Sequence, residues 1–139
     1  KKSISIVKNM KEWFTKEAIT NMYIDFKVNN LLIVKESKKV IGFICYSSRD
    51  GIIQLLWMAV RKDKQGLGFG KSLLKYLEKE SKKIEVRTIE VKTLTDKDKY
   101  KPYISTRNFY YNNGFIKTGY ERARKRGWDN QIILEKKIS

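Results

Sequence analysis

An apolar run, a glycine-rich loop and a helical pattern follow one another directly in the middle of the chain. The run "IIQLLWMAV" (52–60) has the length and composition of a buried β-strand. A polar loop containing "QGLGFGKS" follows, and Leu73, Leu74 and Leu77 then recur at helical spacing among lysines. The strand needs a sheet to join, and the helix needs a face of that sheet to cover. This order restricts the fold to an α/β or α+β sheet flanked by helices.

Apolar patterns predict the rest of the sheet. Further strands are expected at 3–7, 31–37, 39–47, 85–94 and 132–138. The second and third of these read as a hairpin, and "RDG" turns from it into the run at 52–60. We predict a mixed, twisted sheet of six or seven strands in one domain (1–139). The strands ending at Val60 and near Thr93 should be parallel neighbours that splay apart at their C-terminal ends.

Two further helices are predicted outside this centre. The first covers residues 10–28, with Asn9 as its N-cap and a break near Thr15 or Asn21. The second is a short helix over "STRNFYYNN", which Gly114 can end because glycine tolerates the left-handed conformation that follows many helices. Helices therefore lie between strands along the chain, as a layered α/β or α+β domain requires.

The loop before the central helix has three closely spaced glycines, Gly66, Gly68 and Gly70, followed by a lysine and a serine. Backbone N–H groups converge where such a loop leads into a helix, and the helix N-terminus attracts anions. A Walker A loop would need glycine where Gln65 stands, and a dinucleotide fingerprint would need the spacing G-x-G-x-x-G. Neither pattern fits. The open alternatives are another kind of phosphate cradle or a mobile, glycine-rich surface loop.

Two motifs together resemble the GNAT superfamily of N-acyltransferases. Gln65-x-x-Gly68-x-Gly70 is similar to the Q/R-x-x-G-x-G/A acyl-CoA loop that follows a strand in that superfamily. The segment 103–115 is similar to its A-x-x-F-Y-x-x-x-G-F helix, although Thr106 replaces the alanine. "WMAV" and "GWDN" look like a bacterial branch of the same superfamily. The resemblance implies a GNAT-like fold over nearly the whole chain.

The resemblance implies acetyl-CoA as the co-substrate and no metal. Backbone amides of the loop would hold its pyrophosphate. The loop residues predicted to bind it are Gln65, Gly66, Leu67, Gly68, Phe69, Gly70, Lys71 and Ser72. The preceding strand would splay at a bulge, so that the backbone of Met58, Ala59 and Val60 pairs with pantetheine. The Met58 N–H is the candidate oxyanion donor. The alternative interpretation of residues 55–60 is a buried core strand. Both interpretations can be true, because alternate residues of a strand face opposite sides of the sheet.

Tyr110 is the candidate catalytic acid. A phenol with a pKa of about 10 is well matched to an alkyl thiol, so proton transfer to a departing thiolate is nearly balanced. Tyr103 and Tyr111 lie on the same helical pattern and are rival candidates. The alternative interpretation is that Tyr110 is one packed aromatic side chain among several.

A general base is harder to identify. Relatives in the superfamily often carry a glutamate on the strand before the loop, but here Gln54 and Trp57 stand at the plausible positions. Glu90 and Asp129 are acids that could serve, and each also reads as a solvated surface residue. No base is assigned from the sequence.

Charge and composition exclude several classes of function. The formal charge of +16 comes from 31 lysines and arginines against 15 acids, and the basic residues are spread from Lys1 to Lys137. A nucleic-acid surface would need them clustered, so such a partner is not expected, whereas anionic ligands are attracted. The chain has no histidine and one cysteine, Cys45, in an apolar run. These counts argue against a zinc site, a histidine base or an internal disulfide, and predict a buried Cys45 thiol.

The sequence shows no apolar segment of the kind found in signal peptides or membrane spans, so a cytoplasmic protein without a membrane partner is expected. A homodimer is compatible with the sequence. We predict an N-acetyltransferase that moves an acetyl group from acetyl-CoA to a primary amine by direct attack in a ternary complex. The alternative is a non-catalytic basic module that binds CoA or contacts nucleic acid.

The acceptor is expected to be a small-molecule amine or a peptide N-terminus. The segment 121–130 holds four basic residues against two acids. A positive rim of this kind would favour an acceptor with a negative group near its amine and disfavour polyamines. The same segment could equally be a solvated hairpin without a role in acceptor choice.

Overall fold

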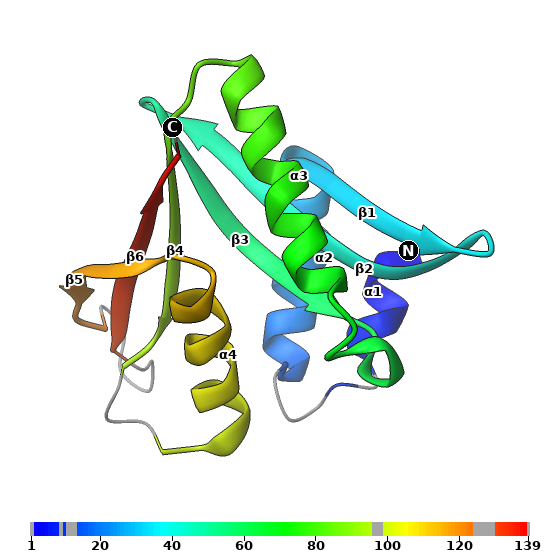
Figure 1. Cartoon of the computed structure of the whole chain (residues 1–139). Helices are drawn as coiled ribbons and strands as arrows, with labels where there is room; N and C mark the ends of the chain where they lie inside the picture. Colours follow the sequence, from blue (N-terminus) through cyan, green and yellow to red (C-terminus); the bar gives the residue numbers. More distant parts are fainter. Residues whose placement is uncertain (1, 9, 11–13, 96–98, 124–129, 139) are drawn as a thin grey trace.

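The computed structural model describes residues 2–8, 10, 14–95, 99–123 and 130–138. Within them, six strands form one mixed sheet in the order β1-β2-β3-β4-β6-β5 (Figure 1). The strands are β1 (Asn30–Glu36), β2 (Lys39–Arg49), β3 (Ile52–Val60), β4 (Thr88–Leu94), β5 (Ile116–Glu121) and β6 (Gln131–Lys137). The helices are α1 (Lys2–Val7), α2 (Lys16–Val28), the 3₁₀ turn η1 (Lys62–Lys64), α3 (Phe69–Lys83) and α4 (Lys101–Asn112). The predicted fold class and strand number are confirmed.

Two tight turns join β1, β2 and β3 into an antiparallel meander. Ser37 and Lys38 connect the first pair, and Asp50 and Gly51 connect the second. All four residues have positive φ, between 51° and 78°. Such consecutive positive values match the right-handed twist of two-residue hairpins. The predicted hairpin and the turn at "RDG" are confirmed.

Helices cover both faces of the sheet (Figure 1). α3 and α4 pack on one face, where Leu73, Leu74 and Leu77 join a core with Ile53 and Tyr110. α1 and α2 cover the β1–β3 region of the opposite face and enclose a second, smaller core around Met22 and Phe43. The leucine stripe predicted for the central helix therefore points inward as expected.

Leu77 is the residue of this stripe whose loss we expect to cost the most. Its side chain is fully buried in the larger core, so Leu77→Ala removes apolar contacts and leaves a cavity. We expect the free energy of unfolding to fall by about 2–5 kcal/mol, measured by urea denaturation. Tyr76→Ala is the matched control on the same helix, because its side chain is 54% exposed and should change stability by less than about 0.5 kcal/mol. Equal losses for both variants would contradict the assigned helix face.

The predicted strand at 3–7 is wrong, because these residues belong to helix α1. Ile6 and Val7 are adjacent and both buried, and they pack with Met22 and Phe43. Successive side chains of a strand point to opposite faces, whereas two neighbours on a short amphipathic helix can both face the sheet. The alternation of polar and apolar residues over 3–7 is compatible with a short strand or a short helix. In the structure the segment packs on β2 as a helix.

The predicted helix over 10–28 is confirmed only in its second part. α2 starts after Thr15, whose hydroxyl oxygen accepts a hydrogen bond of 3.1 Å from the Ala18 N–H as an N-cap. The predicted break near Thr15 is therefore the start of the helix. Asn9, the predicted cap, lies outside the described residues.

Strand β5 was not predicted from the sequence pattern. It lies at the edge of the sheet, pairs only with β6, and all of its residues are exposed or half-buried. Without a buried face it lacks the apolar alternation that identifies a strand. The segment 3–7 is not a strand and β5 is an additional one, so the number of strands in the described part of the chain is still six.

β3 and β4 are parallel neighbours over only part of their length. Residues 52–55 pair with 88–91, and the pairing then stops although the strands continue to Val60 and Leu94. β3 stays paired with β2, where the register shifts so that Leu56 forms a bulge. The predicted splay of the two strands is confirmed, and it opens the centre of the sheet.

In the described part of the chain, no helix combines the length and the apolar character needed to cross a membrane.

Candidate functional site

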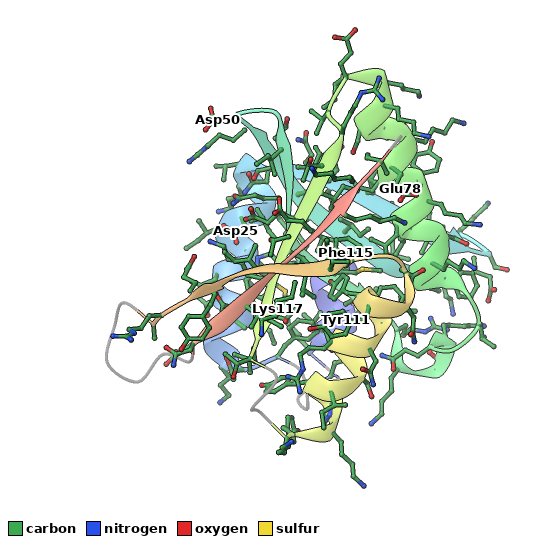
Figure 2. All side chains as sticks on the ribbon, turned by 60° about the vertical axis from the view of Figure 1, so that its left-hand side comes forward. Asp25, Asp50, Glu78, Tyr111, Phe115 and Lys117 are labelled. Carbon is green, nitrogen blue, oxygen red and sulfur yellow. The ribbon has the colours of Figure 1, made fainter. Side chains whose placement is uncertain are left out.

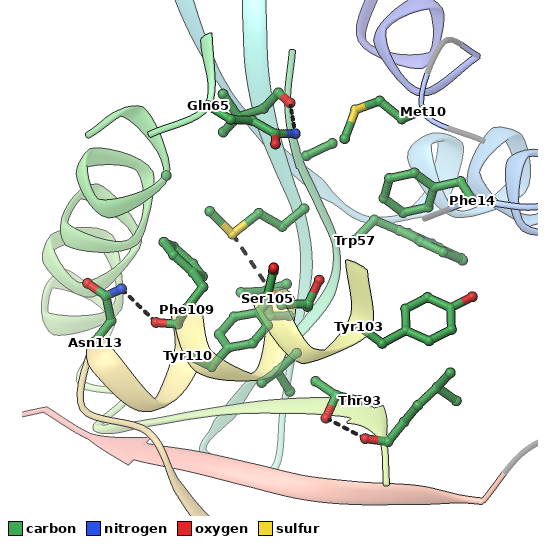
Figure 3. A pocket seen from close by; sticks show the side chains of 18 of the residues that line it. Met10, Phe14, Trp57, Gln65, Thr93, Tyr103, Ser105, Phe109, Tyr110 and Asn113 are labelled. Atoms are coloured by element: carbon green, nitrogen blue, oxygen red, sulfur yellow. Dashed lines mark hydrogen bonds between the residues drawn. The ribbon is translucent and has the colours of Figure 1, made fainter. Parts of the chain in front are cut away.

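A cleft of about 790 Å³ lies where β3 and β4 separate (Figure 3). Its walls are the second half of β3, the end of β4, the glycine loop with the first turn of α3, and α4. Side chains from the region before α2 line its far end. The cleft thus collects segments that are distant in sequence, at the carboxyl ends of two parallel strands.

The backbone of β3 presents an open edge to this cleft. The Arg61 N–H donates to the Ile41 carbonyl oxygen of β2 at 2.7 Å, which fixes the direction of alternate residues along the strand. Ala59 therefore turns its backbone groups toward β2, whereas Met58 and Val60 turn theirs toward the gap left by β4. The Val60 carbonyl oxygen accepts a bond of 3.1 Å from the Gln65 side-chain amide. Three residues were predicted to pair with pantetheine. Of these, Met58 and Val60 turn their backbone groups toward the cleft, as such pairing requires, whereas Ala59 does not.

The glycine loop ends in a helix N-terminus without a side-chain cap. Gly68 is the N-cap residue, with φ +92°, and its carbonyl accepts the first intrahelical bond from the Ser72 N–H at 3.0 Å. The N–H groups of Phe69, Gly70 and Lys71 precede that bond and have no partner within the helix. Three donors and the positive end of the helix dipole therefore meet at one point, which suits an anionic group.

The structure places most of the predicted loop residues at the cleft. Its lining includes Gln65, Gly66, Gly68, Gly70 and Lys71. The side chains of Leu67, Phe69 and Ser72 are outside the lining, and only backbone groups of these three could serve an anion here. Gly70 marks the tightest approach, because a Cβ atom there would lie 3.1 Å from the Phe109 ring and 3.4 Å from the Met58 methyl group.

Tyr110 lies at the centre of the cleft. Its ring packs edge-to-face with Phe109, and both are seen in Figure 3. The ring also packs edge-to-face with Phe115, and the Tyr110 hydroxyl is 4.0 Å from the Met58 sulfur. Burial of this side chain raises the pKa of the Tyr110 phenol above its ordinary value, so the group stays protonated well beyond neutral pH. Tyr103 also lines the cleft, whereas Tyr111 is 36% exposed and does not. The geometry favours Tyr110 over both rivals for contact with a group bound at β3.

Positive charge dominates the described lining. Lys64, Lys71 and Lys92 line the cleft, and no aspartate or glutamate does among the residues that the structure describes. Lys64 pairs with Glu36 at 2.7 Å, and Lys92 pairs with Glu121 at 2.8 Å. Lys71 and the N-terminus of α3 therefore suit the cleft to an anionic ligand, whereas Lys64 and Lys92 already have acidic partners. Elsewhere, charged side chains project outward all around the molecule (Figure 2).

Neither acid considered as a base is brought into the cleft by the described structure. Glu90 is on β4 and accepts a bond of 3.1 Å from the Gln54 side-chain amide, away from the lining. Asp129 lies outside the described residues. Cys45 is buried as predicted, and burial, together with the negative charge of Asp25, raises the pKa of its thiol to about 11.

Two residues at the far end of the cleft, Phe14 and Trp57, were not predicted to form its wall, and neither was Asp25, which lies behind them. The Trp57 indole N–H donates to the Asp25 carboxylate at 2.6 Å, and Phe14 lies against the Trp57 ring. One signal was available for Asp25. It lies three residues after the buried Met22, on the inward face of α2, where an acid needs a partner.

Arg107 is a further residue whose position the sequence did not indicate. It is buried in α4, and its guanidinium donates to the Leu94 carbonyl oxygen at the end of β4, at 3.4 Å. This contact ties α4 to β4 just past the point where β4 leaves β3. It helps to hold α4, and with it Tyr110, over the opening.

Comparisons with known proteins agree with this geometry. Residues 27–117, which are 91 of the 139 residues, match a family model described as an acetyltransferase (GNAT) domain. Among curated proteins, none matches the sequence.

Solved structures of similar fold include three acetyltransferases. A Desulfovibrio desulfuricans protein described as an acetyltransferase of the GNAT family has a TM-score of 0.82 at 22% identity, over 99% of this chain and 91% of that one. The ribosomal-protein-S18-alanine N-acetyltransferase of Escherichia coli has a TM-score of 0.69 at 21% identity, over 91% and 79%. An aminoglycoside 6′-N-acetyltransferase complexed with coenzyme A has a TM-score of 0.74 at 16% identity, over 99% and 89%. At these identities the likeness shows a shared fold.

Proposed function

The chain belongs to the GNAT acetyltransferase family, and from this premise we propose that it transfers an acetyl group from acetyl-CoA to a primary amine. The observation that carries the proposal is the open edge of β3, which leads directly to the uncapped N-terminus of α3. An extended chain with an amide backbone and a pyrophosphate at one end matches both features. The solved neighbour that contains coenzyme A supports the same choice of ligand.

The residues of this cleft fit such a ligand. Met58 and Val60 would pair with the pantetheine amides in the manner of an added strand. The N–H groups at the start of α3, with Lys71 nearby, would hold the pyrophosphate. Acetyl-CoA would supply an acetyl group activated as a thioester. No metal takes part in this proposal.

The transfer is proposed to occur by direct attack in a ternary complex. The amine nitrogen forms a bond to the thioester carbon, the carbon–sulfur bond breaks, the nitrogen loses a proton and the sulfur gains one. The Met58 N–H, on the open side of β3, would stabilise the oxyanion, and such a donor is typically worth about 10²–10³ in rate. Holding both reactants in one cleft contributes a further large part of the rate.

Tyr110 would protonate the departing thiolate. Its hydroxyl points toward Met58, where the thioester is proposed to lie. The raised pKa of Tyr110 keeps the proton on the phenol until the thiolate forms.

The test is a thiol-release assay with acetyl-CoA and a panel of amino acids, acidic peptides, aminoglycosides and polyamines. We expect turnover with a small amine or a peptide N-terminus, and a faster reaction with an acceptor that carries a negative group than with spermidine. Lys71, at the start of α3, supports the preference for a negatively charged acceptor over spermidine. Tight binding of acetyl-CoA without any amine-dependent thiol release would instead favour the non-catalytic alternative. Spermidine as the best acceptor would overturn the charge argument.

A further inference from the structure

The end of the cleft away from α3 is walled by aromatic side chains. Phe14 precedes α2, Trp57 lies on β3, and Tyr103 lies in the first turn of α4, and all three line the cleft. Figure 3 shows the three side chains on the side of the cleft opposite α3, with Tyr110 between them and the helix. All three are only half-buried. This aromatic wall is a different region from the glycine loop at which the proposed co-substrate would be held.

Each part of the aromatic wall is held in place by its own contacts. The Trp57 indole donates to Asp25 at 2.6 Å, and its ring meets Phe14 at 6.3 Å between centroids with the planes tilted by 57°. Tyr103 packs edge-to-face against Tyr100 at 4.8 Å. Contacts of this kind set ring orientation before any ligand arrives, so little conformational entropy is lost on binding.

The aromatic wall is apolar apart from the Tyr103 hydroxyl. The only polar group of the indole of Trp57 is used by Asp25, so the ring offers its faces and not a donor. In the described lining no carboxylate is present to pair with a second ammonium group, and Lys71 repels one. A ligand held here gains contact area and not a salt bridge.

The position of the aromatic wall also limits the length of the ligand. Trp57 directly precedes Met58 on β3, and its side chain packs toward the smaller core whereas that of Met58 packs toward the larger one. The Trp57 ring therefore lies on the other face of the sheet from the Met58 side chain, about 3.3 Å along the strand from the Met58 backbone. Consider a ligand whose amine is separated from its aromatic ring by one or two carbons. With its ring against Trp57, its amine would lie beside the thioester proposed to bind at Met58. A longer or highly charged amine would leave the aromatic wall unused.

We propose that the aromatic wall of Phe14, Trp57 and Tyr103 is the acceptor subsite and selects a primary amine borne close to an aromatic ring. This inference rests on the proposed acetyl transfer and adds the class of acceptor. The ring can belong to a free arylalkylamine or to the first residue of a peptide. Asp25 acts as a positioning residue that holds the Trp57 ring.

The experiment compares 2-phenylethylamine with n-butylamine, which has a similar primary amine but no ring, and with the dipeptide Phe-Ala. We expect kcat/KM at least tenfold higher for 2-phenylethylamine than for n-butylamine. Activity on the dipeptide alone would assign the ring to a peptide N-terminus and still support the subsite. Equal or better activity on n-butylamine than on both aromatic amines would overturn it.

Variants test the residues themselves. Trp57→Leu should raise KM for the preferred aromatic amine about tenfold and lower kcat/KM for n-butylamine by a smaller factor, while the Kd of acetyl-CoA stays within twofold. Asp25→Ala should also raise KM for the aromatic amine. Asp25→Asn should retain the wild-type KM, because its amide oxygen still accepts a hydrogen bond from the Trp57 indole. Tyr76→Leu is the matched control, an exposed aromatic on the outer face of α3. A Trp57→Leu variant that loses activity equally on all amines would contradict a role in selection.

A binding measurement separates this inference from the proposed function. Saturation-transfer NMR with 2-phenylethylamine and with Phe-Ala needs no turnover, and signals lost in Trp57→Leu but kept in Tyr76→Leu support the subsite even if no acetyl group is transferred. Absence of acetyl-CoA binding would refute the proposed function alone. Absence of any Trp57-dependent signal from either ligand, in a protein that binds acetyl-CoA, would refute the subsite alone.

Discussion

Gly68→Val is expected to abolish measurable binding of acetyl-CoA while the protein remains folded. Gly68 has φ +92°, a conformation that a β-branched residue adopts only with strain. The backbone would have to rotate, and the N–H groups at the start of α3 would lose their common direction. Losing two hydrogen bonds to a charged group, at about 1.5–3 kcal/mol each, weakens binding at least about 100-fold. Isothermal titration calorimetry with acetyl-CoA measures this loss.

Gly51→Val is the matched control for this experiment. Gly51 has a similar φ of +78° and open space around its Cα, but it lies in the turn between β2 and β3. The strain of about 1–2 kcal/mol should be similar in both variants and small against a typical stability of about 5–15 kcal/mol. We expect Gly51→Val to bind acetyl-CoA as the wild type does. Unchanged affinity in Gly68→Val would show that the phosphate does not bind at this loop.

Tyr110→Phe is expected to reduce kcat by about 10²–10⁴, because it removes the proton donor for the leaving thiolate and leaves the packing of the ring intact. The Kd of acetyl-CoA should change little, since Tyr110 contributes no group to the proposed phosphate or pantetheine contacts. Pre-steady-state thiol release on the best acceptor measures the effect. The raised pKa of Tyr110 also predicts that wild-type activity does not decline between pH 7 and 10 through loss of this proton.

Tyr111→Phe is the control for the assigned acid. Tyr111 is the next residue of α4, is 36% exposed and does not line the cleft, so its phenol should be dispensable. If Tyr110→Phe kept full turnover and Tyr111→Phe did not, the assignment of the acid would be wrong. Full turnover in both variants would mean that water protonates the thiolate.

Local patterns predicted a large part of the fold because they report on backbone conformation directly. The meander of β1, β2 and β3 followed from three apolar runs and two turns, and Leu77 was correctly placed on the inner face of α3. The same approach failed for 3–7 and for β5. Both segments are short, and their secondary structure depends on the elements they contact. Residues 3–7 pack on β2, and β5 pairs only with β6. Short amphipathic segments hold too few residues to distinguish the two periodicities.

For the site, sequence motifs predicted the residues whose backbone matters. Within the loop from Gln65 to Gly70, Gly66 and Gly68 have positive φ, a conformation that glycine adopts far more readily than other residues. The glycine spacing in the sequence therefore indicates this loop conformation. Asp25 and Arg107 could not be found in this way. Each acts through one distant partner, Trp57 for Asp25 and the end of β4 for Arg107.

By itself the sequence determined the family, the order of most elements and the loop proposed to hold the co-substrate, because these depend on residues close together in the chain. Only the tertiary structure decided which backbone groups of β3 face the cleft, since that direction follows from the register with β2 and the bulge at Leu56. It also decided that Phe14, Trp57 and Tyr103 share one wall. These three come from different elements, and their neighbourhood exists only because β4 leaves β3 after four paired residues and α4 covers the gap.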